Sequence, residues 1–225
     1  GLITLVMVWL WLPDEQLGSD NKRGVPFQPR QLLKFHPSVV GMLLLMTIFF
    51  IFPTNFAIVA SQQQGLSTEA ITIIMVGLDV VAFFVGLVFG RIMSRFRQSV
   101  KYCAPLLFLL GYTSFLVPAK AMTVLGSIFI GMANGVGVPY LNTIASIKGG
   151  KNSATTVMPL LSAALYLGQF VSPLIVLPLS EILFGASDIV APYKVGIVFC
   201  LIFLLQVYCT RHFQSLPPIS TNTEH

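Results

Sequence analysis

Charged residues are scarce in this sequence. Asp, Glu, Lys and Arg make up 9% of the 225 residues, whereas hydrophobic residues make up 55%. A soluble domain carries roughly 25% charged residues, so this chain has too few of them to cover a surface exposed to water. We therefore expect an integral membrane protein. The net charge of +5 lies mostly between the apolar stretches, where it orients a chain in a bilayer rather than binding nucleic acid.

Motifs for metal binding and catalysis are also missing. Cys103, Cys200 and Cys209 show no Cys-x-x-Cys or Cys/His ligand spacing, and we interpret them as membrane thiols rather than metal ligands or disulfides. The sequence has no His-Glu-x-x-His, no Gly-x-Ser-x-Gly and no paired aspartates within one membrane span. We therefore expect no metal, no cofactor and no enzymatic activity.

Long apolar segments are what the sequence does contain. About 20 residues at ~1.5 Å each cross the ~30 Å hydrocarbon layer of a membrane. Six segments meet this requirement, with expected bounds 37–61, 67–94, 101–117, 121–147, 153–182 and 195–211. The predicted fold is an all-α bundle of six transmembrane helices. We expect a loop at 148–152, fraying of the fifth segment near Pro178, and a loop at 181–194.

The flanking segments have other expected roles. Residues 1–12 are apolar but too few to span a membrane, so we interpret them as the end of a truncated transmembrane helix, which makes the chain a C-terminal fragment. An interfacial segment is the alternative. Residues 13–36 mix both charge signs with prolines and are expected to form a cytoplasmic linker. Residues 212–225 are expected to form a disordered cytoplasmic tail.

The basic residues alternate between the two sides of the predicted bundle. One side holds eleven of the thirteen Lys and Arg residues, in the linker, in 91–101, in 148–151 and at Arg211. The other side holds only Lys120 and Lys194. Basic residues favour the cytoplasmic side. The asymmetry therefore predicts a multi-pass protein of the cell membrane with the linker and the C-terminus in the cytoplasm.

Asp79 is the leading candidate for a functional residue. It lies near the middle of the second predicted span, which ends in a basic cluster at Arg91, Arg95, Arg97 and Lys101. An ionisable residue at the membrane midplane costs at least ~2.5 kcal/mol. We expect Asp79 either to take up and release protons or contact substrate, or to pair structurally with a neighbouring amide. A misplaced span boundary is the remaining alternative.

Three amides lie deep in other spans. Asn55 follows Pro53, which kinks a helix and frees a carbonyl, and we expect it to face a cavity or to bond a neighbouring helix. Asn134 and Gln169 are expected either to line a substrate cavity or to join helices. Gly131 and Gly135 stand four apart, a spacing that lets another backbone approach closely.

At this point the chain resembles the C-terminal half of a major facilitator superfamily transporter. The family has a cytoplasmic loop with the pattern Gly, three residues, Asp, Arg, any residue, Gly, Arg. This sequence matches it at Gly90 and Arg95, whereas Ser94 replaces the acid, Arg97 the glycine and Gln98 the arginine. We interpret Arg91, Arg95 and Arg97 as anchors of the topology; the alternative is a conformational latch on the cytoplasmic side.

Two further stretches are similar to the same family. Residues 131–140 resemble its glycine-rich tenth helix. Residues 167–174 resemble its eleventh helix and echo the Gly-Pro signature of antiporters. The resemblance implies that the six spans are helices seven to twelve, that the first, second, fourth and fifth spans face the cavity or the other half, and that the third and sixth face outward. It also implies transport by rocking of the two halves.

We therefore expect secondary active transport of a small organic solute, most simply proton-coupled efflux similar to that of drug/proton antiporters. The partners would be the solute, protons and the lipid bilayer. An alternative is a non-transporting half or scaffold that needs an N-terminal half or another copy of itself. An intramembrane enzyme is a third possibility, for which the sequence offers no motif.

Overall fold

The structure, a computed structural model, describes residues 35–211, without the side chains of 149–156. The predicted truncated helix at 1–12, the linker up to residue 34 and the tail at 212–225 lie outside the described residues. The described elements are all helical: α3 (His36–Gln64), α4 (Thr68–Phe96), the 3-10 turn η1 (Arg97–Ser99), α5 (Val100–Phe115), α6 (Lys120–Phe184) and α7 (Ala191–Cys209).

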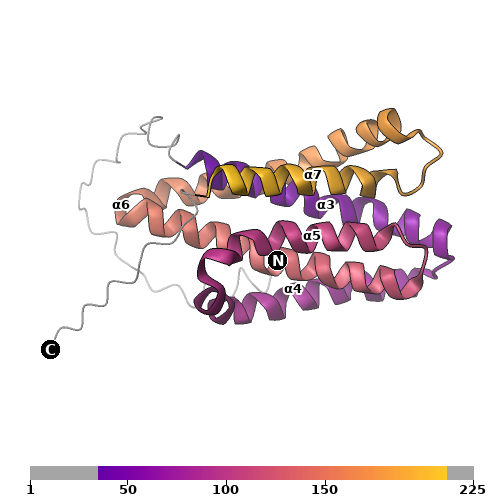
Figure 1. Cartoon of the computed structure of the whole chain (residues 1–225), viewed down its shortest axis with the longest axis horizontal. Coiled ribbons are helices and arrows are strands. Elements are labelled where there is room, and N and C mark those ends of the chain that lie inside the picture. Colours follow the sequence, from indigo (N-terminus) through magenta and orange to yellow (C-terminus); the bar gives the residue numbers. More distant parts are fainter. Residues whose placement is uncertain (1–34, 212–225) are drawn as a thin grey trace, which may run out of the picture.

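Five segments of the described chain are long and apolar enough to cross a membrane: 36–64, 68–115, 120–148, 157–184 and 191–209. The sequence predicts six. The difference arises at 68–115, where α4, η1 and α5 follow one another without a loop. Figure 1 shows that the chain reverses at η1, so that α4 and α5 run in opposite directions.

In segment 68–115 one apolar segment contains two helices, whereas α6 is one helix of 65 residues that contains two apolar segments. Its ribbon turns back near the middle, and its pink first half (120–148) and orange second half (157–184) both extend from that turn (Figure 1). The predicted loop at 148–152 is wrong, since these residues are helical. The predicted fraying near Pro178 is also wrong, because the helix continues to Phe184.

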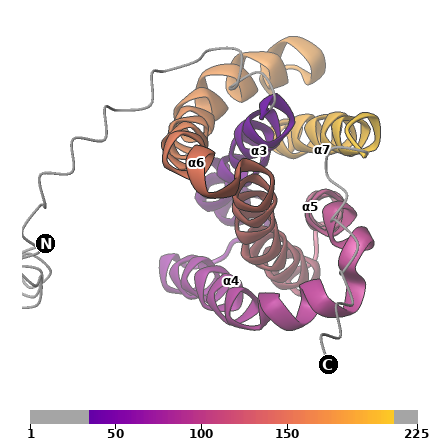
Figure 2. The same ribbon diagram turned by 90° about the vertical axis from the view of Figure 1, so that its left-hand side faces the viewer.

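Helix α3 forms the centre of the bundle. It packs against α6 and α7, and Figure 2 shows it between the two. Its inward side chains are fully buried, including Leu45, Ile48 and Ile51. Phe52 stacks on Phe115 of α5, with ring centroids 5.5 Å apart. The core therefore lies along α3, where α5, α6 and α7 meet it.

Helix α4 lies at the edge of the bundle and packs chiefly against α6 (Figure 2). Only Ile71, Leu78 and Phe89 of its residues are buried. Most of its surface is therefore left uncovered by the part of the chain that the structure describes.

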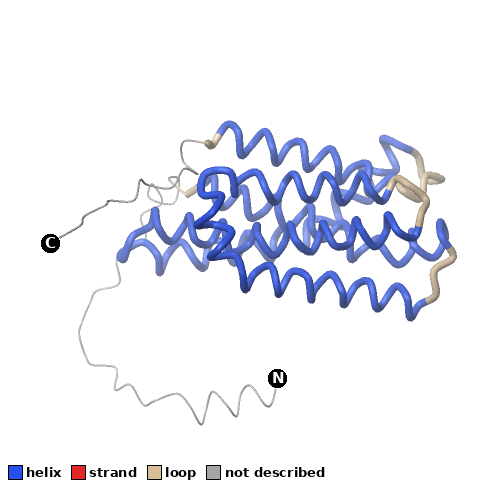
Figure 3. The backbone as a smooth tube through the Cα atoms, turned by 60° about the horizontal axis from the view of Figure 1, so that its bottom comes forward, coloured by secondary structure: helices blue, strands red, loops and turns tan. Residues whose placement is uncertain are grey.

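The loops 65–67, 116–119 and 185–190 gather at one end of the bundle, which we call the loop end (Figure 3). Gly65 takes φ 58° at the end of α3, a left-handed conformation that favours glycine. The Ser67 hydroxyl then accepts a hydrogen bond from the Ala70 N–H and caps α4. At the opposite end Lys101 Nζ lies 3.4 Å from the Arg211 carbonyl.

Candidate functional site

Asp79 lies in the middle of α4, and its side chain is exposed on the surface of this bundle. Val76, Val80 and Phe83 around it are exposed as well, at 55%, 47% and 62%. The Asp79 side chain forms no hydrogen bond or ion pair with another residue within 35–211. The carboxylate therefore stands alone on an apolar face that the described chain does not cover.

The backbone on either side of Asp79 is held against α6 by two glycines. A Cβ added at Gly131 would lie 2.6 Å from the Leu78 carbonyl oxygen, and one added at Gly135 would lie 2.5 Å from the Ala82 carbonyl oxygen. Real Cβ atoms do not approach so closely, so only glycine allows this crossing. The prediction that Gly131 and Gly135 admit another backbone is confirmed, and that backbone is α4.

Asn55 is 5% exposed and serves the backbone of its own helix. Its Nδ2 donates to the Ile51 carbonyl and to Thr54 Oγ1, both at 2.9 Å. Thr54 Oγ1 donates to the Phe50 carbonyl at 2.6 Å. Pro53 removes the N–H that would bond the Phe49 carbonyl. The two side chains donate instead to the next two carbonyls, those of Phe50 and Ile51. Asn55 also lines a cleft at the loop end.

Asn134 and Gln169 are both half-buried on α6. Asn134 precedes Gly135, and its buried Oδ1 has no hydrogen-bond partner among the described residues. Gln169 follows Gly168, where an added Cβ would lie 2.7 Å from the Leu43 carbonyl oxygen of α3. Both amides therefore lie beside glycine-mediated helix crossings. Within the described chain no hydrogen bond links any two of Asp79, Asn55, Asn134 and Gln169.

Gly90 and Arg95 are exposed near the end of α4. Arg97 ends this helix with φ 34°. A positive φ is energetically costly for residues with a side chain, whereas glycine adopts it without this cost. Arg97 is also the position where the loop pattern described above has glycine. Arg97 therefore adopts a positive φ at the position where the loop pattern has glycine.

Sequence reasoning missed two buried contacts to α3. The Tyr112 hydroxyl of α5 donates to the Ile48 carbonyl, one turn before Pro53. The Ser172 hydroxyl of α6 donates to the Thr47 carbonyl at 2.8 Å. Both residues are fully buried. The sequence does show both hydroxyls inside apolar segments. Because a buried polar group needs a hydrogen-bond partner, their position could have predicted contacts to another helix.

Acidic and sulfur side chains are dispersed in this fold. Among residues 35–211 no group of three or more His, Cys, Asp or Glu is placed to hold a metal ion. The described cysteines are free thiols. The arrangement at Asp79 is thus a single exposed carboxylate on a helix whose backbone packs closely against α6 at two glycines.

Comparison with known proteins gives one match. The family model described as Major Facilitator Superfamily matches residues 1–173, which is more than half of the chain. A search of curated proteins finds no match.

Proposed function

We propose a function from one premise, that the chain belongs to the Major Facilitator Superfamily. Members of this family are transporters rather than enzymes, and membership implies that the chain serves membrane transport of a solute. The five apolar helical segments fit a multi-pass membrane protein. Our proposal is secondary active transport of a small organic solute by alternating access, with proton-coupled efflux from the cytoplasm of the cell.

The observation that carries the proposal is the solitary carboxylate of Asp79 on an exposed apolar face. A charged side chain facing lipid at mid-membrane depth costs at least ~2.5 kcal/mol. Coverage by a second helical unit with a water-filled passage between the two removes this cost. That unit would be an N-terminal half of the transporter or another copy of this chain. Asp79 would then line the passage and meet protons.

Protonation of Asp79 can drive the rocking motion through desolvation. A carboxylate is far more costly to take out of water than a neutral carboxylic acid. The protonated form therefore favours the state in which the face of α4 is closed against the second unit, and the ionised form favours the state in which water reaches it. The close crossing at Gly131 and Gly135 ties this movement of α4 to α6.

The remaining candidates have supporting roles in the proposal. Asn134 has a buried amide oxygen without a partner, and Gln169 is half-buried on α6. Together with Asn55 they are proposed to line the solute passage. Large exposed apolar residues on α4 and on the second half of α6 favour an amphipathic solute, because binding cavities have mostly apolar walls with a few polar groups.

Transport in everted membrane vesicles tests this function. Vesicles from cells expressing the chain together with its second unit are energised, and accumulation of a fluorescent amphipathic solute is measured. We expect accumulation that collapses when a protonophore abolishes the proton gradient. Accumulation that survives the protonophore would reject proton coupling, and solute movement only in right-side-out vesicles would reject efflux.

A second candidate function is a non-transporting half or scaffold, which the exposed apolar surface favours. In the most apolar stretch of 68–115 only 11% of the residues are buried within the described chain, and in that of 157–184 only 28% are. Such faces need a cover of protein or lipid. Under our proposal the purified chain alone, reconstituted as a monomer in liposomes, is inactive. Transport by that monomer would contradict the requirement for a second unit.

A further inference from the structure

A cleft opens at the loop end of the bundle, away from the middle of α4. Its volume is about 210 Å³, and its walls come from the last turns of α3, the end of α6, the loop 185–190 and the start of α7. Ile58, Val59, Leu177 and Ile189 give it apolar walls. Acidic residues and amides complete the lining. The cleft is therefore large enough for a small organic molecule and is polar on one part of its wall.

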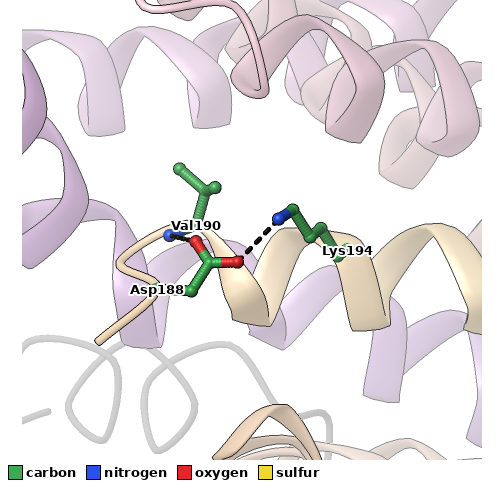
Figure 4. Close-up of polar contacts among 3 residues, drawn as sticks. All are labelled: Asp188, Val190 and Lys194. Atoms are coloured by element: carbon green, nitrogen blue, oxygen red, sulfur yellow. Dashed lines mark hydrogen bonds and ion pairs between the residues drawn. The ribbon is translucent and has the colours of Figure 1, made fainter. Parts of the chain in front are cut away.

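One of the two carboxylates in the cleft is already neutralised. Asp188 Oδ2 lies 2.6 Å from Lys194 Nζ, and Asp188 Oδ1 accepts a hydrogen bond of 3.1 Å from the Val190 N–H (Figure 4). The lysine ammonium also lies 5.3 Å from the centre of the Phe184 ring. Asp188 thus holds the start of α7 in place, and its charge is balanced.

The other carboxylate, Glu181, has no such partner. It lies in the last turn of α6 with an exposed side chain, and within the described chain its carboxylate forms no hydrogen bond or ion pair. Because the charge of Asp188 is balanced by Lys194, the cleft carries one net negative charge. A negative charge between apolar walls attracts a cation and repels an anion.

Asn55 supplies a hydrogen-bond acceptor at the same place. It is 95% buried, since 5% of it is exposed, and it lines the cleft. Its Nδ2 must be the atom that faces the Ile51 carbonyl, because a carbonyl only accepts hydrogen bonds. The amide oxygen is left with no hydrogen bond to any described residue. This oxygen is not among the fully buried atoms that lack a partner, so a hydrogen-bond donor from water or from a ligand can reach it.

We propose that this cleft binds a small organic monocation, a primary ammonium ion with an apolar body. The ammonium group donates hydrogen bonds to the Glu181 carboxylate and the Asn55 amide oxygen, and the body packs against Ile58 and Leu177. This site shares Asn55 with the proposed solute passage, but Asp79 does not line it and binding there needs no gradient, so it goes beyond the proposed transport. Binding measured without transport therefore tests it apart from the proposed function.

The test uses the full chain in detergent, with benzylammonium as the probe and benzyl alcohol as its uncharged counterpart. Dissociation constants are measured by equilibrium dialysis for the parent, for Glu181→Gln and for the matched control Glu69→Gln. Glu69 is an exposed acid in the first turn of α4 and does not line the cleft.

We expect the parent and Glu69→Gln to bind benzylammonium about fivefold more tightly than benzyl alcohol, as one ion pair of about 1 kcal/mol provides. Glu181→Gln should lose this preference. Equal binding of the two probes to the parent would overturn the proposal, as would an undiminished preference in Glu181→Gln.

A second variant tests the position of the site without changing charge. Ile58 is 57% exposed, so Ile58→Trp can be accommodated by the fold and would fill the cleft. We expect this variant to bind benzylammonium at least about threefold more weakly than the parent while keeping its helical circular dichroism. Unchanged affinity in a folded Ile58→Trp would place the probe elsewhere and reject the site.

Discussion

Replacement of Gly135 by alanine should destabilise the contact between α4 and α6. The added Cβ would lie 2.5 Å from the Ala82 carbonyl oxygen, 3.0 Å from Val85 Cβ and 3.1 Å from Ala82 Cα. Carbon and oxygen atoms that are in contact lie at 3.3 Å or more, so the two helices must separate by about 0.8 Å. Backbone atoms cannot rotate away as the end of a side chain does. Overpacking of this kind costs about 1–3 kcal/mol.

Gly77→Ala is the matched control for this change. Gly77 lies on α4, and a Cβ added there has nothing within 4 Å. Both substitutions gain about 1 kcal/mol of helix propensity, so their difference isolates the clash at the crossing. We expect the unfolding equilibrium constant of Gly135→Ala to exceed that of Gly77→Ala by roughly fivefold to 150-fold in a detergent titration followed by circular dichroism. Equal stabilities would refute the close crossing.

Three other substitutions test separate parts of the fold by the same titration. Ser172→Ala removes the 2.8 Å hydrogen bond to the Thr47 carbonyl and should cost about 0.5–1.5 kcal/mol; no loss would contradict that contact. Arg97→Gly should stabilise the chain relative to Arg95→Gly by about 1 kcal/mol, because φ is positive only at the former; the reverse order would contradict the turn geometry. Asp188→Asn should cost at most about 1 kcal/mol, and less at high salt; a loss independent of salt would argue against its ion pair.

The helix ends that the sequence predicted well are those with local chemical signals. Ser67 precedes α4, which begins at Thr68 against an expected 67, whereas α3 runs three residues beyond the expected 61, to Gln64 before Gly65. The start of α7 was placed four residues late, at 195 rather than Ala191. Pro192 was taken as part of a loop, although proline is favoured in the first turn of a helix, where its missing N–H costs nothing.

The interior prolines misled the prediction for a related reason. Pro178 was expected to disrupt its helix, and the helix continues for six more residues to Phe184. In membrane-type bundles, neighbouring helices and Ser or Thr hydroxyls satisfy the backbone groups that a proline frees. The carbonyl that loses its N–H partner at Pro178 is that of Leu174, whereas the Ser180 hydroxyl donates to the nearby Leu177 carbonyl at 2.7 Å. Sequence alone does not reveal whether such a donor is in reach.

The environment of Asp79 could not be predicted, because α4 itself carries apolar side chains on nearly all of its sides. Such a helix has no polar face to indicate which side meets the rest of the chain. Its orientation follows instead from Gly131 and Gly135, which accept the backbone at Leu78 and Ala82. That contact leaves Asp79 on the uncovered side. The glycine spacing was visible in the sequence, but its partner helix was not.

The central claim is that Asp79 couples solute movement to protons, and one comparison tests it directly. Parent and Asp79→Asn proteins, each with the second unit, are reconstituted in liposomes, and both gradient-driven accumulation and downhill exchange of the solute are measured. We predict that Asp79→Asn, which cannot ionise, loses accumulation and retains downhill exchange. Full gradient-driven accumulation by Asp79→Asn would contradict the account.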